Sequence, residues 1–232
     1  MTPLQEALGA GDYNKIKKLL DDGEDPNEMC NGIPLICLAL QENYFEIADL
    51  LVERGATIDA MVVKNRETPL LHCVVSIKNA KALKWALNKG LHPDIKDKYA
   101  GTTPLHMAAY IGNTDCARIL VEHGGCINVT DNDKLTPLHC AAGKGQYDMV
   151  QFLLEHGADI NAANKAGKTP LNYAVGNREI EQLLSDKGAT KDSTNGGAHL
   201  VEKISEKITM ALIFILLLIG LRKLLRFVFK HQ

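Results

Sequence analysis

The chain has 232 residues, 46% of them hydrophobic, and a formal net charge of −2. This length and apolar content suffice for one elongated domain and a short additional segment. Residues 200–232 carry six Lys or Arg against two Glu, so they contribute +4 and residues 1–199 contribute −6. An acidic body argues against non-specific binding to nucleic acids, and no nucleic-acid partner is predicted.

A short phrase, usually Thr-Pro-Leu, occurs six times along the chain. Its prolines are separated by 31, 35, 35, 33 and 33 residues. A fixed period in this range is typical of stacked small units, each of which buries its apolar face against its neighbours. The six copies are Thr2-Pro3-Leu4, Ile33-Pro34-Leu35, Thr68-Pro69-Leu70, Thr103-Pro104-Leu105, Thr136-Pro137-Leu138 and Thr169-Pro170-Leu171.

The fifth unit shows the predicted local structure most clearly. Thr136 suits the N-cap of a helix, because its hydroxyl can accept a hydrogen bond from a free backbone N–H, and Pro137 suits the first helical position. This helix is predicted to end at Gly145. The apolar segment 148–154 then predicts a second, buried helix, which Gly157 closes with a left-handed conformation. Each unit is therefore predicted to be a helix–turn–helix followed by an extended loop.

The pattern resembles the ankyrin repeat. The resemblance is carried by Thr103-Pro104-Leu105-His106-Met107-Ala108-Ala109 with Gly112 and Gly124, and by glycines at matching places in the other units. It covers residues 1–190 and implies an all-α repeat solenoid of six stacked helix–turn–helix repeats, with hairpin-like loops projecting to one side. The first and last units have the polar outer faces expected of terminal caps.

The second and third units depart from this pattern. In both, 22 residues separate the expected capping position from the closing glycine, against 21 in the first, fourth and fifth units. Each is therefore predicted to carry one extra residue. Ile33 is predicted to replace the capping threonine, and Leu71 to occupy the position of the family's histidine, with His72 one place later. The sixth unit is predicted to be short.

The six cysteines include no CxxC pair. Cys37, Cys73 and Cys116 fall on helix positions predicted to face the packed interior, where a free cysteine acts as a small hydrophobic residue. The N-terminal residues do not form a secretory signal, so the reducing cytosol is the expected compartment. Trp85 aligns with apolar second-helix positions and is predicted to pack in the core.

No arrangement of residues indicates catalysis. The sequence has no HExxH motif, no P-loop and no paired Cys/His spacing, so neither an enzyme activity nor a metal or cofactor is predicted. The segment Asp131-Asn132-Asp133 lacks the glycine and the later glutamate of a calcium loop and is more typical of a solvated hairpin tip. The resemblance implies that His106 and His139 bond loop backbone.

The resemblance also implies a binding surface for an unidentified protein partner. In ankyrin proteins the loop tips and the first helices line a concave recognition surface, and exposed aromatic and basic residues are common interface anchors. The predicted partner-binding residues are Arg66, Lys98, Tyr99, Met107, Tyr110, Asp131, Asp133, Lys134 and Lys165.

The C-terminal part differs in composition. Residues 191–207 predict a flexible linker, and residues 208–221 form an uncharged apolar run. As a helix this run is about 21 Å long, which is shorter than the roughly 30 Å hydrocarbon core of a bilayer. A basic amphipathic end follows, so residues 208–232 are predicted to be a membrane-anchor helix that contacts lipid through residues 208–229. An interfacial or re-entrant helix, or a helix that docks on protein, remains an alternative.

These features together predict a membrane-anchored adaptor or scaffold that recruits a cytosolic partner through its ankyrin stack. A short apolar segment with a basic end resembles the tail anchors of the mitochondrial outer membrane, with the endoplasmic reticulum as the second choice, and the repeats would face the cytosol. The alternative is a subunit or regulator of an integral membrane complex, whose tail helix packs with other transmembrane helices.

Overall fold

The computed structural model of the chain describes residues 2–58, 62–63, 66–67 and 69–191. Within these ranges twelve helices form six consecutive pairs. The first helices of the pairs are α1 (Pro3–Gly9), α3 (Leu35–Gln41), α5 (Leu70–Ser76), α7 (Pro104–Ile111), α9 (Pro137–Gly143) and α11 (Pro170–Tyr173). The second helices are α2 (Tyr13–Asp21), α4 (Phe45–Glu53), α6 (Ala80–Asn88), α8 (Thr114–Glu122), α10 (Tyr147–Glu155) and α12 (Arg178–Asp186).

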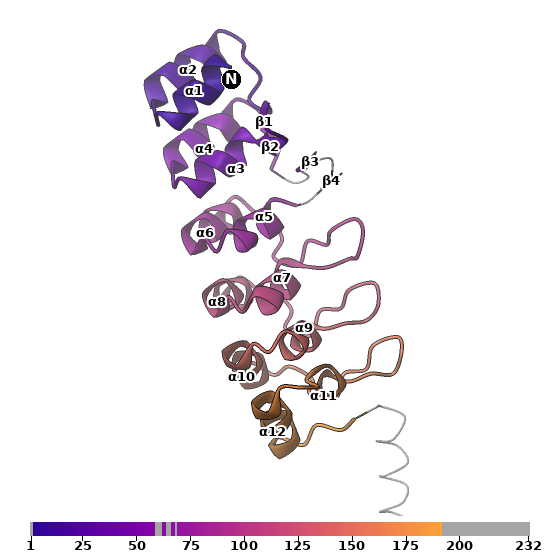
Figure 1. Ribbon diagram of the computed structural model, residues 1–232. Coiled ribbons are helices and arrows are strands. Elements are labelled where there is room, and N and C mark those ends of the chain that lie inside the picture. Colours follow the sequence, from indigo (N-terminus) through magenta and orange to yellow (C-terminus); the bar gives the residue numbers. More distant parts are fainter. Residues whose placement is uncertain (1, 59–61, 64–65, 68, 192–232) are drawn as a thin grey trace, which may run out of the picture.

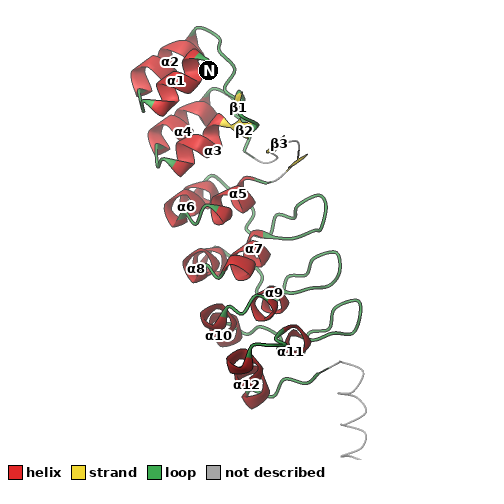
Figure 2. Cartoon of the chain, viewed as in Figure 1, coloured by secondary structure: helices red, strands yellow, loops and turns green. Residues whose placement is uncertain are grey.

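The pairs stack in chain order (Figure 1). The first helices lie on one side of the stack and the second helices on the other, and the loops that follow the second helices project past the first helices. We call the surface formed by the first helices and these loops the loop-side face. Two loops contain short antiparallel hairpins, β1 (Met29–Cys30) with β2 (Ile33–Pro34) and β3 (Val62–Val63) with β4 (Arg66–Glu67) (Figure 2). The predicted helical solenoid is therefore correct for the framework of the described residues.

One apolar core runs through the stack. The second residue of each first helix is at most 5% exposed, although these helices are short. Alanines such as Ala39, Ala108 and Ala141 are completely buried, and their small size lets neighbouring pairs approach closely. The buried second residues are Leu4, Ile36, Leu71, Leu105, Leu138 and Leu171.

Most second helices begin at a side-chain cap. An Asp or Asn oxygen accepts a hydrogen bond from the backbone N–H three residues later, which satisfies one of the free donors at a helix start. The capping residues are Asp12, Asn79, Asn113 and Asn177. These caps are local, so each pair defines its own turn before it packs on the next.

The starts of α3 and α5 contradict the sequence prediction. Pro34 and Pro69 occupy the N-cap instead of the first helical position, so Ile33 does not cap its helix. Proline fits there because the N-cap φ angles are −60° and −59°, close to the value that its ring imposes. Counted from these prolines, the closing glycines Gly55 and Gly90 follow after 21 residues, as in the regular units. The extra residue therefore lies before the helix.

The left-handed residue after each first helix supports this register. Asn43 and Lys78 have φ angles of 63° and 58°, and each follows its N-cap proline by nine residues. Gly112 and Gly145, with φ angles of 71° and 72°, follow Thr103 and Thr136 by the same number. Left-handed backbone costs little for glycine and is tolerated by asparagine. The turn therefore sets the register of these units.

The sixth pair is short, as predicted, because α11 spans four residues. Across the described ranges, no helix combines the length and the apolar character needed to cross a bilayer. The linker prediction beyond residue 191 and the anchor prediction for residues 208–232 lie outside the residues that the structure describes.

Candidate interaction surface

A buried histidine joins each of two first helices to the following loop. His106 Nδ1 accepts a hydrogen bond of 3.2 Å from the Thr103 N–H, and His106 Nε2 lies 2.9 Å from the carbonyl oxygen of Leu135. A carbonyl can only accept, so Nε2 carries the proton. His139 makes the same contacts with Thr136 and with the next loop. The expectation that these histidines bond loop backbone is confirmed.

His72 makes the same forward contact. Its Nε2 lies 2.9 Å from the carbonyl oxygen of Thr102. The prediction that Leu71 occupies the family's histidine position is therefore wrong, because the helix starts one residue later than the proline pattern suggested. Burial lowers the pKa of His72, His106 and His139, against the opposing effect of these backbone hydrogen bonds, so the imidazoles are neutral donors to the loops.

Each of three long loops is closed by one acidic or amide side chain. Asp97 accepts hydrogen bonds of 2.7–2.8 Å from the N–H groups of Tyr99, Ala100 and Thr102. Burial opposes the ionisation of Asp97, but these bonds and the Thr102 hydroxyl outweigh it and lower its pKa. Asp131 and Asn164 accept from two N–H groups of their own loops in the same way. The loop shapes are therefore set by side-chain acceptors within each loop.

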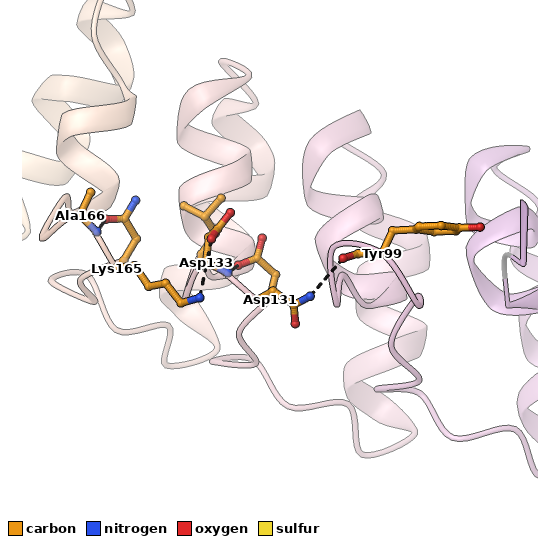
Figure 3. A network of polar contacts seen from close by, with 8 residues as sticks. Tyr99, Asp131, Asp133, Lys165 and Ala166 are labelled. Carbon is orange, nitrogen blue, oxygen red and sulfur yellow. Dashed lines mark hydrogen bonds and ion pairs between the residues drawn. The ribbon is translucent and has the colours of Figure 1, made fainter.

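Neighbouring loops also bond to one another. The Asn132 N–H donates to the Ala100 carbonyl at 2.9 Å. Asn132 Nδ2 donates to the Tyr99 carbonyl at 3.1 Å (Figure 3). In the next step the Lys165 N–H donates to the Asp133 carbonyl at 2.9 Å. The exposed Lys165 and Asp133 side chains add an ion pair of 3.9 Å, which contributes little to stability (Figure 3). We call this connected row of three loops the loop ladder.

The structure places most predicted binding residues on the loop ladder. Lys98 and Tyr99 lie on its first loop, and the Tyr99 side chain is 61% exposed. Its ring extends away from the Asn132 contact (Figure 3). Asp133 and Lys134 are exposed on the second loop, and Lys165 on the third.

The remaining predicted residues lie in less open positions. Asp131 is half-buried, and its carboxylate holds its own loop. Met107 is half-buried on α7, whereas Tyr110 at the end of that helix is 49% exposed. Arg66 belongs to β4, and its side chain lies outside the description. The loop-side face therefore brings together residues from α7 and from the three loops of the ladder.

Two residues on this face were missed from the sequence. Lys144 places its ammonium group 4.3 Å from the centre of the Tyr110 ring, a cation–π contact between adjacent pairs. Tyr173 on α11 is 37% exposed, and its ring packs edge-on against His139. Tyr173 is the fourth residue of α11, as the predicted Met107 is of α7. This equivalence is the sequence feature that could have identified Tyr173.

Trp85 and two cysteines are less buried than expected. Trp85 packs against the core only in part, and its indole N–H donates to Asp49 on α4 at 2.9 Å. Cys116 is buried, as predicted. Cys37 and Cys73 are only half-buried, and of the two Cys37 packs against the core in part. The six cysteines are free thiols.

Comparison with protein families matches residues 70–164 to the model of ankyrin repeats, in three copies. These residues are thus similar to ankyrin repeats. The matched region contains α5 to α10 and the first two loops of the ladder, together with the start of the third. Ankyrin repeats imply a role in protein–protein interaction, and the geometry of the loop-side face agrees with that role.

Several curated proteins are similar to parts of the chain. A putative ankyrin repeat protein of Rickettsia felis is 29% identical over 132 residues, which are 57% of this chain and 45% of that protein. The human transient receptor potential cation channel subfamily A member 1 is 31% identical over 124 residues, 53% of this chain and 11% of the channel. A probable 26S proteasome regulatory subunit p28 of Saccharomyces cerevisiae is 30% identical over 135 residues, 56% of this chain and 58% of the subunit. The chain thus spans less than two thirds of each.

Proposed function

We propose that the chain is a non-catalytic adaptor that recruits a protein partner through its loop-side face. In this proposal all six helix pairs act as one ankyrin stack, and residues 208–232 hold the stack at a membrane with the repeats facing the cytosol. The mitochondrial outer membrane is the first candidate and the endoplasmic reticulum the second. Anchoring raises the concentration of the recruited partner at the membrane surface.

The loop ladder is the observation that carries the interaction part of the proposal. Its tips expose Tyr99, Lys134 and Lys165, while main-chain hydrogen bonds from loop to loop hold the backbone beneath them. A surface that is already ordered loses little conformational entropy when a partner binds. A large exposed aromatic ring on such a support is a typical anchor for a protein interface.

The anchoring part of the proposal rests on the sequence. The 14 uncharged residues at 208–221 and the basic residues that follow fit a short span with an interfacial end. The alternative function is that of a subunit or regulator of an integral membrane complex. The similarity to part of a cation channel favours this alternative, since the matched channel is itself a membrane protein.

Site-specific photocrosslinking of the full chain in cells tests the interaction surface. A photoreactive phenylalanine derivative in place of Tyr99 should crosslink a discrete protein, whereas the same derivative in place of Lys84, exposed on the opposite-side helix α6, should not. A soluble crosslinked protein supports the adaptor, and an integral membrane protein supports the alternative. Equal crosslinking from both positions would show that the loop-side face is not the binding surface.

Alkaline carbonate extraction tests the anchor separately. The full chain should stay in the membrane pellet, and a truncation ending at Glu206 should be released. Release of both would refute the anchor while leaving the crosslinking result intact.

A further inference from the structure

Two thiols from different helix pairs meet on the loop-side face. Cys37 lies on α3 and Cys73 on α5, and their side chains hydrogen-bond each other. Both are half-buried and line a mainly apolar pocket of about 300 Å³ between the two helices. The other lining residues are Ile33, Gln41, Val74, Ser76 and Ile77. The thiols are therefore in mutual contact and beside a space that a small molecule can enter.

The position of Cys37 distinguishes it from an ordinary packing residue. It is the third residue of its helix, and in the other five pairs this position holds a polar residue, Gln5, His72, His106, His139 or Asn172. Gln5, His72, His106 and His139 bond to the following loop. Cys37 lies against a thiol of the next pair, Cys73. A contact between pairs is thus made here by two groups that can be joined covalently.

We propose that Cys37 and Cys73 form a peroxide-sensitive dithiol that closes reversibly to a disulfide between α3 and α5. The site is a modification site, its oxidant is hydrogen peroxide, and its reductant is a cellular thiol. The disulfide would join residues 36 positions apart in the chain and fasten the second helix pair to the third.

The electrostatics of the pair assign the two roles. The hydrogen bond from Cys37 lowers the pKa of Cys73, although burial acts in the opposite direction. The same hydrogen bond, together with burial, raises the pKa of Cys37. The Cys37 S–H therefore stabilises a thiolate at Cys73, and the thiolate is the nucleophilic form of cysteine. Cys73 is the residue that reacts with peroxide, and Cys37 is the residue that resolves the product.

The reaction balances in two steps. The Cys73 thiol releases its proton to solvent, and the thiolate attacks one oxygen of hydrogen peroxide. The O–O bond breaks, Cys73 becomes a sulfenic acid, and the departing hydroxide takes up a proton to form water. The Cys37 sulfur then attacks the Cys73 sulfur, the S–S bond forms, the S–O bond breaks, and hydroxide leaves with the Cys37 proton as water. Two thiols are oxidised, and one peroxide is reduced to two waters.

Cysteine mapping on the full chain in detergent micelles tests the proposal. After brief peroxide treatment and alkylation of the remaining thiols, mass spectrometry should find the Cys37 and Cys73 peptides joined and lighter by two hydrogen atoms. Dithiothreitol should separate them. The exposed Cys126 reports that peroxide has acted on the chain. The proposal would be overturned if peroxide oxidises Cys126 but leaves Cys37 and Cys73 as thiols that react with the alkylating agent. A disulfide from Cys37 or Cys73 to any other cysteine would also overturn it.

Three variants test the assigned roles. In Cys37→Ser, Cys73 should stop at the sulfenic acid, which dimedone traps; in Cys73→Ser, Cys37 should remain a thiol. Cys140→Ser, a half-buried cysteine on α9, is the matched control and should leave the Cys37–Cys73 linkage unchanged. Dimedone labelling of Cys37 but not of Cys73 would reverse the roles and contradict the assignment. Mass-spectrometric mapping of the unaltered chain shows whether the Cys37–Cys73 disulfide forms, even where a variant fails to fold.

Discussion

The main-chain N–H of His72 donates a hydrogen bond of 3.0 Å to the carbonyl oxygen of Pro69, but His72 Nδ1 receives none in return. The imidazole is 2% exposed, so no partner among the described residues, and little solvent, reaches this atom. In the fourth pair the equivalent atom of His106 accepts from the N–H of Thr103. Proline has neither an N–H nor a hydroxyl, so its presence at the N-cap leaves the ring nitrogen unsatisfied.

The substitution Pro69→Thr should therefore stabilise the protein. The new residue supplies an N–H and a hydroxyl to His72 Nδ1, and it also caps α5. Pro34→Thr is the matched control, because it adds the same cap at α3, where the third helical residue is Cys37 and no imidazole needs a donor. The free energy of unfolding in urea should rise by about 1 kcal/mol more for Pro69→Thr than for Pro34→Thr. Equal effects would mean that the unsatisfied nitrogen costs nothing.

Stability should fall when the pH drops below about 6.5. Burial lowers the pKa of His72, His106 and His139 from the ordinary value of 6.5, so the unfolded chain binds protons that the folded chain does not. The stability that these three histidines contribute is fully present above about pH 6.5. It is lost as the pH falls through the pKa values of the histidines in the folded protein. Each histidine adds at most about 1.4 kcal/mol per pH unit to the slope. Urea unfolding at several pH values measures it.

His106→Asn tests the source of this pH dependence. The sixth pair already carries Asn172 at the equivalent position, where its Oδ1 accepts from the Thr169 N–H at 2.9 Å. The variant should keep the cap, lose the bond to Leu135 and be destabilised by about 1 kcal/mol at pH 7. Its slope below pH 6.5 should be shallower than that of the parent chain. An unchanged slope would exclude His106 as a contributor.

Trp85 and Asp49 should be energetically coupled. The indole N–H of Trp85 donates to Asp49 at 2.9 Å, and Lys89 lies 2.7 Å from the same carboxylate oxygen. A double-mutant cycle with Trp85→Phe and Asp49→Ala should give a coupling of about 0.5–1 kcal/mol, because the site is partly exposed. Glu122→Ala, at the C-terminal end of α8, is the control and should show no coupling with Trp85→Phe. If the effects of Trp85→Phe and Asp49→Ala are additive, the hydrogen bond between α4 and α6 makes no net contribution to stability.

Gly101→Ala should cost more than Gly124→Ala. Both glycines have positive φ angles, 68° and 86°, so alanine is strained at either position by about 1 kcal/mol. A Cβ at Gly101 would also collide with the Asn132 side chain and lie 3.2 Å from its backbone nitrogen, whereas nothing lies within 4 Å at Gly124. We expect a further loss of about 1 kcal/mol for Gly101→Ala, together with faster hydrogen exchange at the Asn132 N–H. Unchanged exchange would show that the loop ladder tolerates the added carbon.

The parts of the fold that depend on neighbouring residues were predictable from the sequence. Thr103 and Thr136 begin their helices as expected, because the N-cap, the following proline and the later glycine act over a few positions. Pro34 and Pro69 misled the prediction, since a proline fits either the N-cap or the first helical position. Asn43, nine residues after Pro34, indicates the correct helix start, because the left-handed glycines follow Thr103 and Thr136 by the same number of residues.

The candidate site was predictable only in part. The exposed Tyr99 and Lys165 follow from their places at loop tips. The role of Asp131 could not be predicted, because its carboxylate is occupied only once the loop has closed on it. The contact between Cys37 and Cys73 also depends on packing, since residues 36 positions apart meet only when two helix pairs stack in this register.

The histidine bonds bear on how the stack could be lengthened. His106 and His139 each bond to a carbonyl at the end of the loop that closes their own unit, at Leu135 and Lys168. A duplicated copy of residues 103–135 inserted after itself would therefore carry both the imidazole and the carbonyl that it bonds. Such a unit brings its own loop support with it, so the interior units that contain these histidines are modules for building longer binding surfaces.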